Sequence, residues 1–263
     1  MVIDFHVHMF PDAMAAKTIE ILADKSGLAP HADGTVGMTS AKMKEAGVAK
    51  AVHQNIATNP HQMQKVNDFA IAINQKEEFI CFGSVHPEAE NYKDEIKRIA
   101  DSGLQGIKLH PDYQGFFIDD PVMQPLYEEV LKHDLILLFH TGIDIGLPPP
   151  VHAAPKAIAN TLGLFSGEKV VFAHMAGFQM NEEAMEYVIG RDVYIDTSCT
   201  AEYADRATWV TMLQAHNPDK ILFATDFPWG DFGHEIEAIQ KLPVDEQLKE
   251  KILHENAEAL LSL

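Results

Sequence analysis

The chain has 263 residues, of which 46% are hydrophobic, 22% charged and 8% aromatic. This composition is ordinary for a globular protein that buries a full core. Its 39 acidic and 20 basic residues give a net charge of -19, which argues against a general affinity for nucleic-acid phosphates or anionic membrane surfaces. We therefore expect a small-molecule substrate, with no nucleic-acid or membrane partner.

The beginning of the chain predicts no export signal, because the first six residues read as a strand without a basic segment or a cleavage site. The longest apolar runs, such as residues 135–139, are too short to span a bilayer. The two cysteines, Cys81 and Cys199, fall within apolar segments, which suits reduced buried thiols. These features predict a soluble protein of the cytoplasm.

Eight short apolar runs, separated by longer segments with helical spacing, predict repeated βα units around a parallel sheet. The runs cover residues 2–8, 48–56, 79–86, 106–110, 135–140, 169–174, 193–198 and 220–226. Eight units in a chain near the roughly 250 residues of a typical TIM barrel favour an α/β fold of the (β/α)8 class, formed by one domain over residues 1–263. An open doubly wound sheet is less consistent, because no glycine-rich nucleotide fingerprint follows the first run.

Amphipathic segments between the runs predict the helices, at residues 91–102, 121–132, 182–189 and 246–261. Two connections, residues 11–46 and 142–159, are longer than a barrel needs. Long connections at the top of a barrel commonly shape the pocket or close over it. The alternative is a tolerated surface insertion, and the sequence does not choose between them.

Histidine is the unusual residue type, with 14 copies in the chain. In the first run, Asp4, His6 and His8 alternate with apolar residues and are expected to share the face that points into the barrel. Two imidazoles at positions i and i+2 lie about 6 to 7 Å apart, within reach of one metal ion.

Later runs end in further polar side chains that are expected at the same rim. These residues are His86, Lys108, His110, His140, His174 and Asp226. Active sites of (β/α)8 barrels gather at the C-terminal ends of the strands, and nitrogen and carboxylate donors from several strands suit a zinc-like or manganese-like ion. The sequence therefore predicts a metal site at this rim.

The order of five motifs resembles the amidohydrolase superfamily, in particular its amidohydrolase-related branch, which includes aminocarboxymuconate-semialdehyde decarboxylase-like enzymes. The motifs are Asp-Phe-His-Val-His at residues 4–8, Gly-Ile-Lys-Leu-His-Pro at 106–111, Phe-His-Thr-Gly at 139–142, Phe-Ala-His at 172–174 and Ala-Thr-Asp-Phe-Pro at 224–228. They run from the first predicted strand to the last, so the resemblance covers essentially the whole chain. Each motif alone is unspecific.

The resemblance implies one divalent metal, zinc or alternatively manganese, held by His6, His8, His140 and Asp226. It also implies that His174 lies beside the water on the metal. Such a site lowers the pKa of the water and supplies hydroxide near neutral pH. Asp226 would take the proton from this water, and His174 would act as general acid or base or stabilise the oxyanion.

The fourth run leaves two alternatives open. Lys108 either pairs with a substrate carboxylate or forms an internal ion pair, for example with Asp4. Some branches of the superfamily differ and carry a carboxylated lysine at this position, which bridges two metals. We predict a mononuclear site, in which Lys108 and His110 line the substrate pocket. His86 and Ser198 are further candidates for substrate binding.

The resemblance implies a metal-dependent hydrolase that attacks the carbonyl carbon of an amide, lactone or ester. The alternative is a metal-dependent decarboxylase or hydratase of an unsaturated or aromatic carboxylic acid, since fold and metal do not dictate the reaction. A metal nuclease is disfavoured by the net charge and by the absence of a carboxylate in the fourth run. An inactive metal-binding barrel is disfavoured because all the site residues are present. If the enzyme is oligomeric, a homodimer is expected.

Overall fold

The computed structural model describes residues 1–263 and contains eight parallel strands paired in chain order. The strands are β1 (Ile3–Val7), β2 (Lys50–Gln54), β3 (Phe79–Gly83), β4 (Gly106–Leu109), β5 (Ile136–Phe139), β6 (Val170–Phe172), β7 (Tyr194–Asp196) and β8 (Ile221–Leu222). Every strand lies within one of the eight runs that the sequence predicts. The sheet curves around so that its last strand returns to its first.

Backbone hydrogen bonds close the barrel between β1 and the segment around β8. The Phe5 amide donates to the Phe223 carbonyl at 2.8 Å, and the Asp226 amide donates to the His6 carbonyl at 2.9 Å. The last strand is shorter than the predicted run 220–226, so Asp226 lies beyond its end. These bonds hold Asp226 directly beside the C-terminal end of β1.

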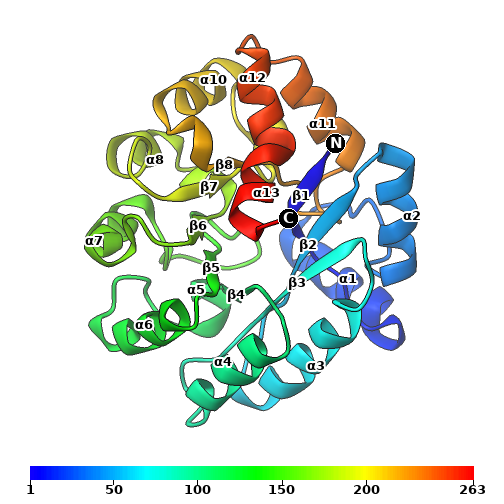
Figure 1. The fold of residues 1–263 in the computed structure, drawn as a ribbon, viewed down its shortest axis with the longest axis vertical. Coiled ribbons are helices and arrows are strands. Elements are labelled where there is room, and N and C mark those ends of the chain that lie inside the picture. Colours follow the sequence, from blue (N-terminus) through cyan, green and yellow to red (C-terminus); the bar gives the residue numbers. More distant parts are fainter.

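Helices surround the barrel, as Figure 1 shows. They are α1 (Asp12–Ser26), α2 (Val36–Ala46), α3 (Met63–Ile73), α4 (Tyr92–Asp101), α5 (Pro111–Gln114), α6 (Gln124–Lys132), α7 (Pro155–Phe165), α8 (Asn181–Tyr187), α9 (Thr200–Tyr203), α10 (Arg206–Ala215), α11 (Phe232–Gln240), α12 (Glu246–Glu250) and α13 (Asn256–Leu261). The predicted helix 246–261 is continuous but contains a wider π-helical turn between α12 and α13. None of the helices combines the length and the apolar character needed to cross a membrane.

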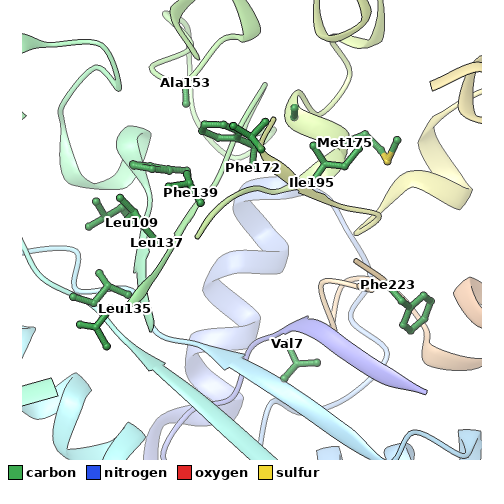
Figure 2. Close-up of a cluster of buried hydrophobic side chains, with 14 of the residues drawn as sticks. Val7, Leu109, Leu135, Leu137, Phe139, Ala153, Phe172, Met175, Ile195 and Phe223 are labelled. Carbon is green, nitrogen blue, oxygen red and sulfur yellow. The ribbon is translucent and has the colours of Figure 1, made fainter. Parts of the chain in front are cut away.

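Two apolar clusters form the core. The larger one lies between the strands and the surrounding helices, and Figure 2 shows Leu137, Phe139, Phe172 and Ile195 contributing to it from successive strands. The smaller cluster joins the alternate residues of these strands, such as Leu138, to the C-terminal helix α13. This smaller cluster fills the barrel, and α13 covers the barrel's near end in Figure 1. The opposite end, where the strands finish, is left for polar side chains.

The first strand departs from the alternation that the sequence suggests. Ile3 and Phe5 belong to the cluster inside the barrel, and the Phe5 ring lies edge-on to Phe82 with the centroids 5.8 Å apart. Val7 belongs instead to the outer cluster. The pairing register of β1 with β2 shifts between Asp4 and Val7, as at a bulge. This irregularity turns the end of the strand so that its two histidines reach the polar end of the barrel.

Asp4 therefore does not join His6 and His8 as the sequence predicts. Its carboxylate accepts hydrogen bonds from the Thr225 hydroxyl at 2.6 Å and from the His6 amide at 2.9 Å. Complete burial raises the pKa of Asp4 to about 7, although these hydrogen bonds oppose the rise. Asp4 thus links β1 to the segment after β8 by hydrogen bonds and does not join the two histidines.

Candidate metal centre

His6 and His8 each use one ring nitrogen to hold the ring in place. The Nδ1 atom of His6 lies 2.9 Å from the Asp196 carboxylate, and the Nδ1 atom of His8 lies 2.9 Å from the Gln54 carbonyl. Both partners are acceptors, so both Nδ1 atoms carry the hydrogen and both Nε2 atoms present a lone pair. Burial first, and then the charge of Lys108, lower the pKa of His6 to about 3, so this ring is neutral.

Asp226 brings a carboxylate to these two lone pairs. One of its oxygens lies 3.0 Å from His8 Nε2 and 3.4 Å from His6 Nε2. Its backbone adopts a left-handed conformation with φ of 64°, which is uncommon for a residue other than glycine and clusters at functional sites. Burial raises the pKa of Asp226, but its close contacts with His8 and His6 outweigh this effect, and the net pKa is below its ordinary value. The carboxylate is ionised.

His140, the fourth predicted ligand, lies on the same cavity with one nitrogen unused. Its Nδ1 atom is 3.1 Å from His174 Nε2, whereas its buried Nε2 atom has no hydrogen-bond partner. Burial, followed by the neighbouring His110, lowers the pKa of His140 well below its usual value. The geometry groups His140 with His110 and Asp144, apart from the group of His6, His8 and Asp226. The structure thus gathers three of the four predicted ligands and places the fourth beside them.

A continuous chain of hydrogen bonds links His140 to His6 behind the cavity. From His140 the chain passes to His174, whose Nδ1 atom lies 2.8 Å from the Ser198 hydroxyl. The Ser198 hydroxyl donates to Asp196, and the other oxygen of Asp196 receives the Nδ1 hydrogen of His6. One set of tautomers satisfies every link and leaves the Nε2 atoms of His6 and His140 without a hydrogen, so that both can act as acceptors. The chain therefore orients both rings as neutral nitrogen donors.

We expect Asp196→Asn to weaken metal binding about 10- to 100-fold, because a carboxylate behind a ligating imidazole fixes its tautomer and raises its basicity. The amide is nearly isosteric, so the barrel should keep its stability. Competition with a chromogenic chelator measures the change in the metal Kd. Glu235→Gln, at a buried carboxyl that bonds no histidine, serves as the matched control. An unchanged metal Kd in Asp196→Asn would show that this chain of hydrogen bonds has only a structural role.

Lys108 is a buried cation at the floor of the site. Its ammonium lies 3.0 Å from His6 Nε2 and forms no ion pair with a carboxylate, and its side chain is 1% exposed. Asp4, the alternative partner, is bound by Thr225 and is not available. Burial lowers the pKa of Lys108 to about 8, while the charges of nearby carboxylates partly restore it. Of the two predicted roles, the internal pair with Asp4 is excluded by the geometry.

His110 is stacked between two rings and has both nitrogens engaged. Its Nδ1 atom accepts from the Tyr113 amide, and its Nε2 atom lies 3.2 Å from the Asp144 carboxylate. The His140 ring is parallel to it, with the centroids 4.1 Å apart and an angle of 6°. The Tyr113 ring covers the opposite face. His110 lines the cavity as predicted and at the same time supports the ring of His140.

The long segment after β5 supplies Asp144 and folds back over the cavity. It does so at Gly142, which has a φ of 84° and where a Cβ atom would lie 2.0 Å from the Phe178 amide nitrogen. Only glycine fits this close approach. The segment after β1 likewise lines the cavity through α1. The sequence left open whether these two connections shape the pocket or are surface insertions, and in the structure both contribute to the wall.

His86 and Ser198 do not reach the cavity wall, although the sequence suggested substrate contacts for both. The His86 Nδ1 atom accepts from the Glu88 amide at 3.3 Å, and the ring is 4% exposed behind the rim. Ser198 is fully buried in the hydrogen-bond chain described above. Neither side chain can touch a substrate in this arrangement, so both assignments are corrected. The position of Ser198 indicates support of His174 instead.

The cavity at this end of the barrel has a volume of about 530 Å³. Its floor holds the predicted site residues His6, His8, Lys108, His110, His140, His174 and Asp226. Aromatic side chains line the walls, namely Phe10, Phe69, Tyr113, Phe178 and Trp229. Such a combination of an apolar wall and a few convergent polar groups is typical of a small-molecule site.

The floor fits a divalent cation. Three hydrogen-bond acceptors converge here, namely the Nε2 atoms of His6 and His8 and an oxygen of Asp226. His140 adds a buried Nε2 atom that has no hydrogen-bond partner. A shared positive charge would satisfy all four acceptors. Sequence reasoning did not foresee the roles of Asp196 and Asp144, because their significance depends on which histidine each one meets across the barrel.

The sequence profile of the amidohydrolase family matches residues 3–263. The chain belongs to the amidohydrolase family. This match confirms the family, and the class of enzyme, that the five sequence motifs predicted. No curated protein sequence matches the chain significantly.

Solved structures confirm the (β/α)8 fold of this family member. An uncharacterised TIM-barrel protein from Bordetella bronchiseptica is 22% identical, with a TM-score of 0.82 over 99% of this chain and 98% of that chain. A 2,6-dihydroxybenzoate decarboxylase from Rhizobium is 16% identical, with a TM-score of 0.73 over 99% and 98%. A 5-carboxyvanillate decarboxylase from Novosphingobium aromaticivorans, complexed with manganese and 4-hydroxy-3-methoxy-5-nitrobenzoic acid, is 16% identical, with a TM-score of 0.72 over 100% and 96%.

Proposed function

We propose that this protein is a metal-dependent, non-oxidative decarboxylase of an aromatic carboxylic acid that carries a phenolic hydroxyl. The sequence analysis gave a hydrolase as the main hypothesis and a decarboxylase as the alternative. The two structurally similar decarboxylases support the opposite order, because their names specify phenolic ring acids. The aromatic wall of this cavity suits the same kind of ring.

The observation that carries the proposal is the unpaired cation at the cavity floor. A buried charge without a counter-ion is costly, and a ligand carboxylate would supply the missing partner. Lys108 is such a cation, and it lies beside the nitrogen of His6 that faces Asp226. If the carboxylate of the acid binds Lys108, the bond between its ring carbon and its carboxyl carbon, which breaks in the reaction, lies beside the metal centre.

The metal is proposed as one manganese or zinc ion held by His6, His8, His140 and Asp226. When bound, it supplies positive charge that stabilises the negative charge developing on the substrate. In the reaction the bond between the ring carbon and the carboxyl carbon breaks, its electron pair stays on the ring carbon, and carbon dioxide leaves. The ring carbon must then take a proton. Of the two predicted catalytic groups on the floor, we assign this proton transfer to Asp226, because His140 and Ser198 engage both ring nitrogens of His174.

The proposal is tested by incubating the manganese- or zinc-loaded enzyme with 2,6-dihydroxybenzoate, 5-carboxyvanillate and 2-hydroxybenzoate in deuterated water. We expect release of carbon dioxide and deuterium at the ring carbon that carried the carboxyl group. The corresponding methyl esters and amides form the parallel arm. Hydrolysis of these esters or amides, with the free acids left intact, would refute the decarboxylase and support the carbonyl hydrolase.

We further propose that the enzyme acts in the cytoplasm. This proposal is supported by Cys81 and Cys199, which are buried and form no disulfide, as is usual for cysteines of cytosolic proteins. A homodimer also remains a proposal, which sedimentation velocity of the metal-loaded protein would test.

A further inference from the structure

The cavity continues outward from the metal centre along one face of α1. Four side chains of this helix line it at intervals of four residues, namely Met14, Thr18, Leu22 and Ser26. Residues four apart lie above one another on a helix, and twelve residues at 1.5 Å each span about 18 Å. The cavity is therefore an elongated groove as well as a pocket at the barrel mouth.

The groove has a second helical wall on α3 and the turn before it. Gln62, Lys65, Val66 and Phe69 line the cavity, and their spacing of three, four and seven residues places them on one face. No acidic side chain lines this outer part, although the chain has 39 acidic residues. The two helical stripes thus bound a groove that has no negative charge and to which each helix contributes two apolar side chains.

The volume exceeds what a single-ring acid needs. An acid of about eleven non-hydrogen atoms would fill at most about 330 Å³ even if each atom took the roughly 30 Å³ share of a water molecule. The cavity measures about 530 Å³. The remaining space must lie toward the groove, because the floor is already occupied by the site residues.

The two apolar side chains on the α1 wall of the groove, Met14 and Leu22, are not buried against the rest of the protein. Only Ala15 and Ile19 of this helix are buried, whereas Met14 is 52% exposed and Leu22 is half-buried on the groove side. Apolar side chains that line a groove next to a reaction site lower the free energy of a ligand that covers them.

At the same share of about 30 Å³ per atom, the remaining ~200 Å³ holds about six further atoms. We infer that the substrate carries an apolar arm of at least six carbons, which extends from the carboxylated ring and lies between α1 and α3. This inference rests on the proposed function for the head of the molecule only. The arm itself is recognised by the two helical stripes, independently of the metal.

The test compares binding of three probes to the metal-loaded enzyme by calorimetry: 2-hydroxybenzoate, 4-heptyl-2-hydroxybenzoate and 4-heptylphenol. Burying a methylene completely strengthens binding about fourfold, so seven half-buried ones give about 100-fold. We expect this gain between the two acids. Equal affinities of the two acids would overturn the inference.

Two tryptophan variants locate the arm. Thr18→Trp fills the groove and should remove the gain from the heptyl group, so that the two acids bind this variant with equal affinity. Ile21→Trp, on the exposed side of the same helix, is the matched control and should keep the gain. An equal loss of the gain in both variants would overturn the inference.

The phenol separates the two proposals, because it has an arm but no carboxylate. Binding of 4-heptylphenol that Thr18→Trp abolishes and Ile21→Trp preserves would support the groove, even if no acid in the series were decarboxylated. Decarboxylation of 2-hydroxybenzoate without any gain from the heptyl group would support the proposed function and refute the groove.

Discussion

Wild-type protein loaded with manganese or zinc should hold about one metal ion per chain, and the variants His6→Ala and Asp226→Ala should each hold almost none. Four ligands that together contribute about 10–16 kcal/mol give about 2.5–4 kcal/mol per ligand, which is a loss of about 70- to 900-fold in affinity. The expected result follows from the convergence of these side chains within 3.4 Å. Elemental analysis of the dialysed proteins measures it.

The matched control is His216→Gln, which changes a buried histidine outside the cavity. Both ring nitrogens of His216 bond backbone groups, at Gly190 and Val193, so its loss affects folding but no ligand. We expect this variant to retain its metal. A second ion in the wild type would refute the mononuclear site, and failure to acquire any metal would refute the metal centre.

His140→Ala decides whether the metal centre includes the fourth predicted ligand. The ring has a free, buried Nε2 atom but is grouped with His110 and Asp144. Loss of the ion in this variant would support the four-ligand set. Retention of one full equivalent would restrict the set to His6, His8 and Asp226.

The order and position of the strands could be predicted because each strand is a short apolar run with a polar residue at its end. The run 135–140, for example, contains β5 and places His140 at its end, as observed. The same periodicity predicts that Lys108 points inward, and it is buried at the floor. Features that one strand encodes locally were therefore accessible from the sequence.

The remaining details arise only when the barrel closes. The irregular register of β1 reverses the expected direction of Asp4, because pairing with β2 changes within the strand. The left-handed backbone at His174 and Asp226 is uncommon for these residue types and is held by surrounding contacts. Asp144 meets His110 from a connection that has no motif. Long-range packing determines these positions, so local patterns do not reveal them.

Lys108→Met should lower kcat/KM for decarboxylation about 30-fold or more while the metal stays bound. Truncating one partner of a buried, hydrogen-bonded charge pair costs about 2–5 kcal/mol, and here the partner is the carboxylate of the substrate. The variant also removes the ammonium that donates to His6 Nε2, the lone pair that the metal would use. We therefore expect metal affinity that is equal to or higher than that of the wild type.

This combination of results distinguishes substrate binding from a structural role. Lys97→Met, at an exposed ion pair on α4, removes the same charge far from the cavity and should leave both quantities unchanged. In Lys108→Met the affinity for a phenol without a carboxylate should also be unchanged, because only the carboxylate is expected to contact the ammonium. Loss of both the metal and the activity in Lys108→Met would assign Lys108 to the metal centre instead. Full activity in this variant would refute its role as the partner of the substrate carboxylate.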